Sequence, residues 1–273
     1  MAFGGETAES YYDEGLTASM KGDLKRAEAC FKKALQLDSG FLAARHQLGK
    51  CFLRMGHGKE AIELLNQVVR QRPDQMAPRI DLGYSLLDQG YEDEARQVFN
   101  DIINADYTNA RAYMGLAHIS FRRTQWREAI GYARAALEHG GSHFAAQFLL
   151  GRAASNAGDN QAAAEALENA DTLMEKSLEV KPNNPEGYFL RGEVAYFRKH
   201  YGDALEHYDE ALQHAERGKY YSAYGESFTR LDILGKKGLC YQALDRNERA
   251  REMGDAIVKE DPDHPIGKAL KDL

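Results

Sequence analysis

Two histidines around a short turn have the most metal-like spacing in this chain of 273 residues. His139 and His143 enclose Gly-Gly-Ser, but no cysteine or close pair of carboxylates accompanies them, whereas a protein zinc site normally has three or four such ligands. The acidic run of Glu92, Asp93 and Glu94 stands at an expected helix start, where negative charge complements the helix dipole. We therefore interpret the histidines as turn residues and the acids as capping residues, and we expect no metal site.

Catalytic sequence signatures are missing as well. The sequence contains no HExxH, GxSxG or GxxxxGK[ST] motif, and no GxGxxG motif that follows a strand pattern. The cysteines Cys30, Cys51 and Cys240 have no CxxC spacing, so we interpret them as reduced packing residues. The sequence therefore predicts a protein that is not an enzyme and has no cofactor.

Charge and hydropathy narrow the classes of partner. The formal net charge is −7, which argues against a nucleic-acid partner because phosphate binding depends on Lys and Arg. No run of eighteen apolar residues occurs, so we expect no membrane insertion. The first ten residues lack both the basic start and the apolar stretch of a signal peptide, and we expect a cytoplasmic location.

A pair of small residues recurs seven times and predicts the elements that carry the chain's side chains. A first small residue is followed twelve positions later by alanine, and both series step by 34, 34, 34, 34, 41 and 46 residues. The first series is Gly15, Gly49, Gly83, Ala117, Gly151, Gly192 and Gly238, and the second is Ala27, Ala61, Ala95, Ala129, Ala163, Ala204 and Ala250. Such a period indicates stacked supersecondary units, with small residues where two helices cross closely.

The residues at these positions resemble the tetratricopeptide repeat. Leu48 and Gly49 with Phe52, Ala61, Leu65, Val68 and Pro73 are similar to its pattern of Leu-Gly, aromatic, Ala, large apolar and Pro over 34 residues. The resemblance implies an all-α fold, a right-handed superhelical solenoid of about seven helix-turn-helix units. Two positions depart from the pattern, Ala133 and Gly254, where a bulky residue is usual, and we expect looser packing there.

The repeat divides the chain into ranges. We expect a short tail over residues 1–7, a single solenoid over 8–264 and the remnant of a cap over 265–273. The expected units are 8–41, 42–75, 76–109, 110–143, 144–184, 185–230 and 231–264.

The two longer steps mark departures from a regular repeat. Residues 160–180 contain no Gly or Pro and continue one apolar stripe, which predicts a single helix that projects beyond its neighbours. Residues 218–230 form an aromatic insertion with Tyr220, Tyr221, Tyr224 and Phe228. One interpretation is that the insertion packs over the gap between the last two units, by lengthening a helix. The other is a second interaction patch, since aromatic residues are enriched at interfaces.

The resemblance also implies a ligand surface, because the family usually binds ligands along its first helices. The positions carried over are Tyr12, His46, Lys50, Arg54, Tyr84, Arg111, Met114, His118, Phe121, Arg122, Phe148, Arg152, Phe189 and Tyr196. This set is aromatic and cationic, and suits a peptide with carboxylates and apolar anchors. The alternative is that the aromatics only fill space between helices and the cations are solvated.

Two functions remain open on this sequence. The first is an adaptor that binds a protein or peptide segment in its concave groove. The second is a scaffold that forms homo-oligomers through its terminal repeats, because the segment from Ile266 to Leu273 is short for a cap.

Overall fold

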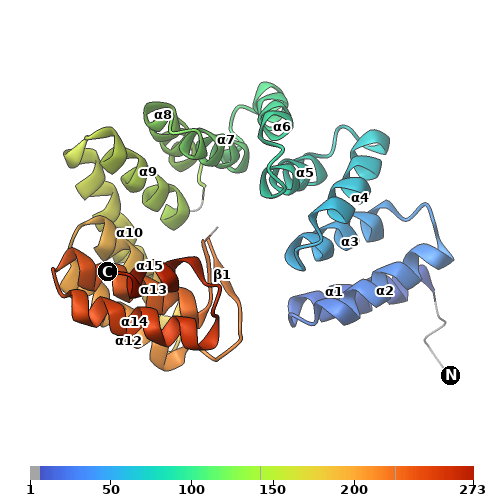
Figure 1. The fold of residues 1–273 in the computed structure, drawn as a ribbon. Coiled ribbons are helices and arrows are strands. Elements are labelled where there is room, and N and C mark those ends of the chain that lie inside the picture. The colour runs from blue at the N-terminus through green and yellow to red at the C-terminus, as the bar shows by residue number, and fades with distance from the viewer. Residues whose placement is uncertain (1–6, 142, 225) are drawn as a thin grey trace. The chain divides into compact units, whose positions relative to one another are not determined.

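The computed structural model describes residues 7–141, 143–224 and 226–273. The predicted tail therefore lies outside the described residues, apart from Thr7. In the described part, the chain forms helical hairpins, one final short helix and a single two-stranded sheet (Figure 1). Each predicted range holds most of two helices.

The helices pair in chain order. The hairpins are α1 (Ala8–Met20) with α2 (Leu24–Leu37), α3 (Leu42–Arg54) with α4 (Gly58–Gln71), α5 (Met76–Asp88) with α6 (Glu92–Ala105), α9 (His143–Ala157) with α10 (Asn160–Val180), α11 (Pro185–Phe197) with α12 (Tyr201–His214), and α13 (Arg230–Ala243) with α14 (Asn247–Glu260). Between α6 and α9 the chain forms α7 (Ala110–Arg122) and α8 (Trp126–Glu138). The strands β1 (Tyr221–Ala223) and β2 (Glu226–Phe228) precede α13, and α15 (Pro265–Lys271) ends the fold.

Helix ends follow from local side chains. Thr7 before α1 and Thr229 before α13 each form a capping box, with Ser10 and Asp232 respectively, which satisfies backbone N–H groups that lack a partner in the helix. The predicted capping role of the acids after Tyr91 agrees with their place in the first turn of α6. The turns inside the hairpins use a residue with positive φ, such as Gly90 at 82°. These signals are local, which explains why the sequence predicted the hairpins.

The recurring glycine is a contact point for a bulky side chain sixteen residues later. A Cβ atom on Gly83 would lie 2.6 Å from the Phe99 ring, and one on Gly192 would lie 2.4 Å from the Tyr208 ring. Both Phe99 and Tyr208 are fully buried. The small residue therefore admits a large one from the second helix, which fixes the close approach of the two helices.

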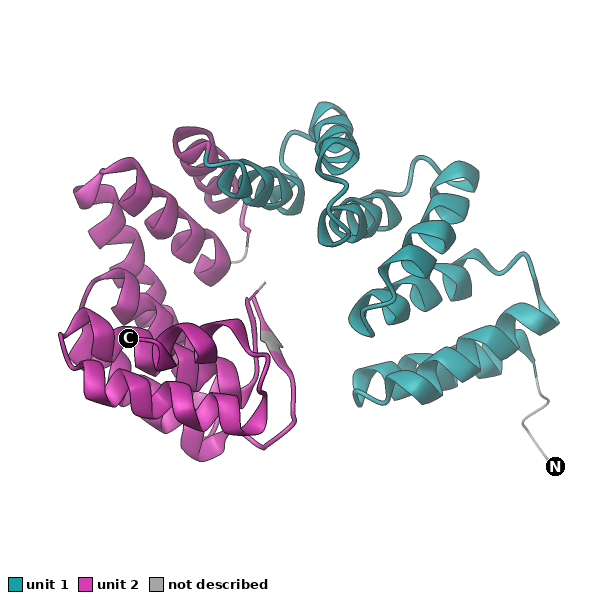
Figure 2. Cartoon of the chain, viewed as in Figure 1, with its two compact units in different colours: residues 1–124 teal, residues 125–273 magenta. Residues whose placement is uncertain are grey.

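The chain divides into two compact units, residues 1–124 and residues 125–273, shown in different colours in Figure 2. Unit 1 ends after α7, and unit 2 begins before α8. Each has its own apolar core: Phe31 and Phe52 lie in a core of unit 1, and Phe148 and Tyr208 lie in a core of unit 2. We describe each unit by itself.

The long helix over residues 160–180 is observed as α10, with 21 residues. Its extra turns do not simply project, because Met174 and Leu178 are buried. Leu178 packs against Gly187 of α11: a Cβ atom added to Gly187 would lie 2.7 Å from Leu178 Cδ2. The extension of α10 thus widens its contact with the next hairpin, and the apolar Val180 at its end is exposed.

The last hairpin corrects one expectation. Gly254 replaces a bulky residue, yet the packing is tight, because a Cβ atom there would lie 2.6 Å from the Lys271 backbone nitrogen of α15. Leu270 of α15 fills the space beside Gly238, where the added Cβ would lie 2.3 Å away. The expected looser packing at Gly254 is therefore wrong, and α15 supplies the missing bulky group.

The aromatic insertion forms a β-hairpin and does not lengthen a helix. Strands β1 and β2 are antiparallel, with Tyr221 opposite Phe228 and Ala223 opposite Glu226. Tyr224 directly follows β1 and has a φ of 54°. The Tyr221 hydroxyl oxygen accepts a hydrogen bond from the Glu216 backbone N–H at 2.8 Å. A short extended ribbon, not a helix, therefore leads into α13.

Candidate functional site

The first helices of unit 1 are joined side by side through polar contacts on one face. The Arg54 Nη1 of α3 donates to the Ser19 carbonyl of α1 at 3.0 Å. The Arg122 Nη1 of α7 donates to the Leu87 carbonyl of α5 at 2.8 Å. Both pairs are 35 residues apart, so the contact follows the repeat. We call the face that carries Tyr12, His46, Lys50, Arg54, Tyr84, Arg111 and Arg122 the unit 1 face.

Asp81 of α5 links three consecutive first helices. Its Oδ2 lies 2.9 Å from His46 Nε2 of α3, and its Oδ1 accepts from Arg111 Nη2 of α7 at 2.9 Å. Burial alone would raise the pKa of Asp81, but the hydrogen bonds from His46 and Arg111 outweigh it and hold the pKa below its ordinary value. Asp81 is therefore charged at neutral pH and neutralises part of the positive charge expected on this face.

Tyr84 is held by the same helices. Its hydroxyl donates to the Arg111 carbonyl at 2.8 Å, and its ring lies edge-on to Phe99 at 5.2 Å between centroids. Burial raises the pKa of Tyr84 to about 12, so the hydroxyl stays protonated and remains a donor. One edge of the ring is thus fixed by packing, and the residue is half-buried.

Three cations on the unit 1 face have, in the part of the chain that the structure describes, no carboxylate within hydrogen-bond distance that would neutralise them. Arg54 and Arg122 donate to backbone carbonyls, which are neutral, and Arg122 lies 3.9 Å from the Glu92 carboxylate. Lys50 is half-buried and makes no ion pair among the described residues. Lys50, Arg54 and Arg122 therefore give this face a positive field that Asp81 only partly offsets.

Three of the predicted ligand residues lie inside the protein. Met114, Phe148 and Phe189 are each less than a tenth exposed, so they fill space between helices, as the alternative interpretation held for aromatics. Tyr12, His118 and Phe121 are half-buried. The Tyr12 ring packs 5.0 Å from the Phe41 ring, which leaves part of its surface available.

In unit 2, Arg152 of α9 is paired and does not lie open to an acidic ligand. Its Nη1 lies 2.5 Å from the Glu226 carboxylate of β2. Its guanidinium Cζ lies 5.2 Å from the Phe148 ring centroid and 4.9 Å from that of Phe197. The first-helix face of this unit is therefore occupied by the chain's own β-hairpin.

The buried acid of the neighbouring helix α11 also has partners within the chain. Glu193 is buried, accepts from the Tyr208 hydroxyl at 2.6 Å and from Lys236 Nζ of α13 at 2.7 Å. The Lys236 ammonium lies 5.7 Å from the ring centroid of Tyr196, a predicted ligand residue. Burial, followed by the Glu193 charge, raises the pKa of Tyr208 well above its ordinary value. These contacts join successive first helices and leave Tyr196 only half-exposed.

The predicted aromatic patch divides into two pairs. Tyr221 and Phe228 are 4% and 1% exposed, and the Phe228 ring stacks on the Phe189 ring at 3.9 Å. Tyr220 and Tyr224 are 67% and 48% exposed. Tyr221 and Phe228 are therefore buried and cannot form an exposed patch, because they lie on the strand face that points toward the helices. A second interaction patch at Tyr220 and Tyr224 stays a prediction.

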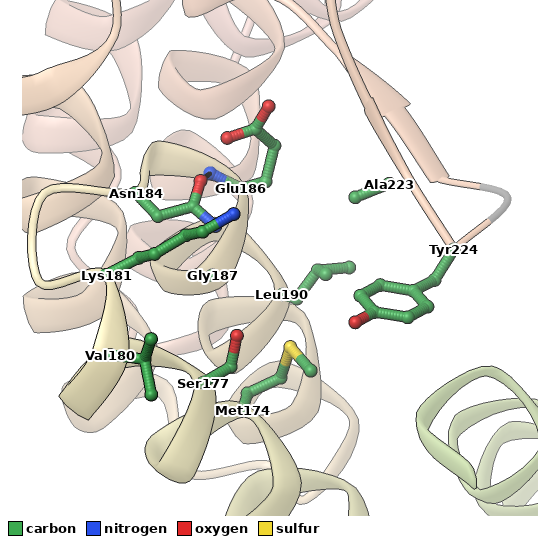
Figure 3. Close-up of a pocket in the computed structure, with 10 residues that line it drawn as sticks. All are labelled: Met174, Ser177, Val180, Lys181, Asn184, Glu186, Gly187, Leu190, Ala223 and Tyr224. Carbon is green, nitrogen blue, oxygen red and sulfur yellow. Dashed lines mark hydrogen bonds between the residues drawn. The ribbon is translucent and has the colours of Figure 1, made fainter. Parts of the chain in front are cut away.

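A cavity of about 340 Å³ lies beside the tip of the β-hairpin. Its walls are the end of α10, the start of α11 and the residues Ala223 and Tyr224. In Figure 3, the Tyr224 ring lies on the same side of the cavity as the apolar side chains of Met174 and Leu190. The cavity is thus lined by apolar groups near the hairpin and by polar groups near Lys181.

Sequence reasoning missed Glu226 as the acidic partner of Arg152. Asp81 and Glu226 lie outside the positions carried over from the repeat pattern, and Glu226 belongs to an insertion. The position of Asp81, two residues before Gly83, was a usable signal because it places the side chain on the same first helix. Glu226 had no such signal, since its contact with Arg152 spans 74 residues.

Within the described residues, no group of three His, Cys, Asp or Glu side chains is arranged to hold a metal ion. The described helices also include none that is long and apolar enough to cross a membrane. The three cysteines are buried and free.

Comparisons with known proteins agree with this geometry. Models described as tetratricopeptide repeat match residues 18–78, 58–119, 114–172 and 185–217, which together cover more than half of the chain. The DnaJ homolog subfamily C member 3 of Gallus gallus is 31% identical over 101 residues, or 37% of this chain. That match spans only 20% of the relative's length.

Two solved structures are similar over nearly the whole chain. A tetratricopeptide repeat protein from Parabacteroides merdae aligns with a TM-score of 0.63 at 14% identity, covering 97% of this chain and 98% of that one. A chain of the APC/C hetero-tetramer Cut9-Hcn1 aligns with a TM-score of 0.64 at 17% identity, covering 97% and 49%. The expected all-α repeat fold is confirmed, and these identities are informative about the fold alone.

Proposed function

Because the chain belongs to the tetratricopeptide repeat family, we propose that it is a non-enzymatic protein-interaction module that binds a peptide segment on the unit 1 face. The fold supplies an extended row of first helices, and this architecture serves protein interaction. The peptide we propose carries carboxylates and at least one apolar anchor. An adaptor of this kind would bring the protein that contains the peptide into an assembly.

The positive charge of Lys50, Arg54 and Arg122 on the unit 1 face is the observation that supports this proposal. Lys50 and Arg54 lie one turn apart on α3, and Arg122 occupies in α7 the repeat position that Arg54 occupies in α3. Arg54 and Arg122 donate hydrogen bonds to neutral backbone carbonyls. Half-buried aromatic rings, those of Tyr12 and Tyr84, accompany them. Cations next to partly exposed rings favour a ligand that is acidic and has apolar side chains. The chain as a whole has a net charge of −7, so these cations do not simply reflect a basic composition.

A selection from a displayed library of random twelve-residue peptides tests the proposal. We expect the wild-type chain to enrich peptides that contain several Asp or Glu and one or more aromatic or aliphatic residues. A variant with Lys50→Glu, Arg54→Glu and Arg122→Glu should fail to bind those peptides, because each substitution replaces attraction by repulsion. Arg111 is left unchanged, since it pairs with the buried Asp81. The triple variant also loses the contacts of Arg54 with Ser19 and of Arg122 with Leu87, so circular dichroism and the melting temperature check that it is folded.

A matched control reverses three cations on second helices of the same unit. Lys25 of α2 with Lys59 and Arg70 of α4 are exposed, so Lys25→Glu, Lys59→Glu and Arg70→Glu change the net charge equally. This control variant should bind the selected peptides as the wild type does. Equal loss in both variants would show a nonspecific charge effect, and equal retention in both would remove the unit 1 face from consideration.

Self-assembly through terminal repeats is the alternative function. Its basis was the short segment after the seventh hairpin, which now proves to be α15, packed against α13 and α14 with Leu270 buried. This cover reduces the support for end-to-end docking at that terminus. Light scattering that shows a monomer over a wide concentration range would count against self-assembly.

A further inference from the structure

Arg152 lies in a setting that is typical of ligand recognition. Its guanidinium Cζ lies 5.2 Å from the Phe148 ring centroid and 4.9 Å from that of Phe197, and the two rings stand edge-on to each other with centroids 5.8 Å apart. Aromatic faces attract a guanidinium and hold its plane, so the donors are oriented before a carboxylate arrives. We call Arg152, Phe148 and Phe197 the Arg152 cradle. All three residues belong to unit 2.

The group that fills the cradle comes from the β-hairpin. Glu226 of β2 places Oε1 2.5 Å from Arg152 Nη1. Two residues before it, the Tyr224 ring lies 5.0 Å from the Phe144 ring of α9, and two residues after it, Phe228 stacks on Phe189 of α11. The hairpin therefore places an aromatic residue on either side of the acid in the sequence, and Glu226 and Phe228 lie in the extended strand β2.

The base and the tip of the β-hairpin are held to different degrees. At the base, Phe228 and Tyr221 are buried in the core of unit 2. At the tip, Tyr224 is 48% exposed, and the Arg152 and Glu226 side chains are 22% and 29% exposed. Tyr224 also has a φ of 54°, which is unfavourable for a residue with a side chain. The tip is thus the displaceable part.

We propose that the Arg152 cradle is a second peptide-binding site, specific for an extended partner segment with a carboxylate side chain flanked by aromatic residues. Tyr224 and Glu226 occupy it in the absence of the partner, and the partner displaces the tip while the base stays packed. The cavity of about 340 Å³ beside Tyr224 offers room for the displaced ring or for an aromatic residue of the partner (Figure 3). The seated hairpin, which has this pattern itself, argues for this class of partner.

A labelled peptide with the sequence of residues 219–229 serves as the probe, with full-length chains as receptors and fluorescence anisotropy as the measurement. We expect the peptide to bind Glu226→Lys at least tenfold more tightly than the wild type, because the lysine repels Arg152 and frees the cradle. The same peptide with glutamine in place of its Glu226 should bind Glu226→Lys at least tenfold more weakly than the original peptide does.

A charge exchange separates recognition from general loosening. Arg152→Glu combined with Glu226→Lys restores an ion pair with reversed signs, and this double variant should bind the peptide no more tightly than the wild type. Circular dichroism and the melting temperature show whether each variant is folded. Should Glu226→Lys not fold, Glu226→Gln keeps the shape of the side chain, removes its charge and allows the same comparison.

Three results would overturn the proposal. The first is a Glu226 variant that folds and binds the peptide no more tightly than the wild type. The second is equal affinity for the peptide with and without the carboxylate. The third is a wild-type chain that is dimeric in light scattering while Glu226→Lys is monomeric, which would make a second copy's hairpin the occupant. The Lys50, Arg54 and Arg122 reversals leave this cradle intact, so failure here is distinguishable from failure of the unit 1 face.

Discussion

Asp81 illustrates how a single carboxylate organises the unit 1 face. It receives hydrogen bonds from His46 and Arg111, which belong to the helices on either side of its own. A buried charge is stable only when its partners replace the lost water, and here both partners are cationic or can become so. The same contacts position Arg111 beside the Tyr84 ring, at 5.7 Å from its centroid. The buried Asp81 thus positions Arg111 beside Tyr84, and both of these side chains are accessible to a ligand.

The substitution Asp81→Asn should destabilise the chain in a manner that depends on pH. The folded-state pKa of Asp81 is lowered, so the charged carboxylate contributes stability above its ordinary pKa of 3.8 and loses it as the pH falls through the lower folded value. We expect the free energy of unfolding of the wild type to exceed that of the variant by about 1 to 2 kcal/mol at neutral pH. Below pH 3.8 the difference should shrink toward zero.

Urea unfolding at a series of pH values from neutral to acidic measures this difference. The variant keeps the shape of the side chain, so a constant gap between the two proteins at every pH would assign the loss to packing. That result would contradict the ion-pair account of Asp81.

At the scale of the elements, glycines determine how closely helices approach. The seventh hairpin departs from the others, because Gly254 contacts the backbone of α15 where earlier hairpins place a bulky side chain. Leu270 then packs against Gly238. A short terminal helix can therefore complete a hairpin that lacks its own large residue, and it covers the apolar end that a repeat array otherwise exposes.

Replacing Gly254 by alanine should destabilise the last hairpin. The added Cβ would lie 2.6 Å from the Lys271 nitrogen and 2.9 Å from the Gly267 carbonyl oxygen, and these are backbone atoms that cannot rotate away. We expect a loss of about 1 to 3 kcal/mol, as for other overpacked sites, measured by urea unfolding.

Gly131→Ala is the matched control for this prediction. Gly131 lies inside α8 with nothing within 4 Å of an added Cβ, so alanine there should stabilise the chain by about 0.5 to 1 kcal/mol. A Gly254→Ala variant that is as stable as the control variant would contradict the close packing of α15.

The hairpins were predictable from the sequence because their signals are local. The Gly83 position and Ala95 recur at a fixed pitch, and the uninterrupted stripe over residues 160–180 predicted α10. The β-hairpin was not predictable, because Tyr224 occupies a left-handed position where sequence rules favour Gly, Asn or Asp. The pairing of Arg152 with Glu226 joins residues 74 positions apart, and a periodic pattern contains no information about such a contact.

At the scale of the whole molecule, the two units differ in how their first helices are used. In unit 1, Lys50, Arg54 and Arg122 retain charge that can attract a ligand. In unit 2, Arg152 is matched by Glu226, and Glu193 is matched by Lys236. One chain thus combines a proposed open site with a proposed site that its own hairpin fills, so two peptides could bind under different conditions.

Titration calorimetry with one selected acidic peptide tests the central claim most directly. The wild-type chain should bind it with a dissociation constant in the micromolar range, about −8 kcal/mol, and more weakly at higher salt because the charges are accessible to ions. The Lys50, Arg54 and Arg122 reversal variant should lose at least tenfold in affinity, while the Lys25, Lys59 and Arg70 variant keeps it. Affinity that is equal in all three proteins would contradict binding on the unit 1 face.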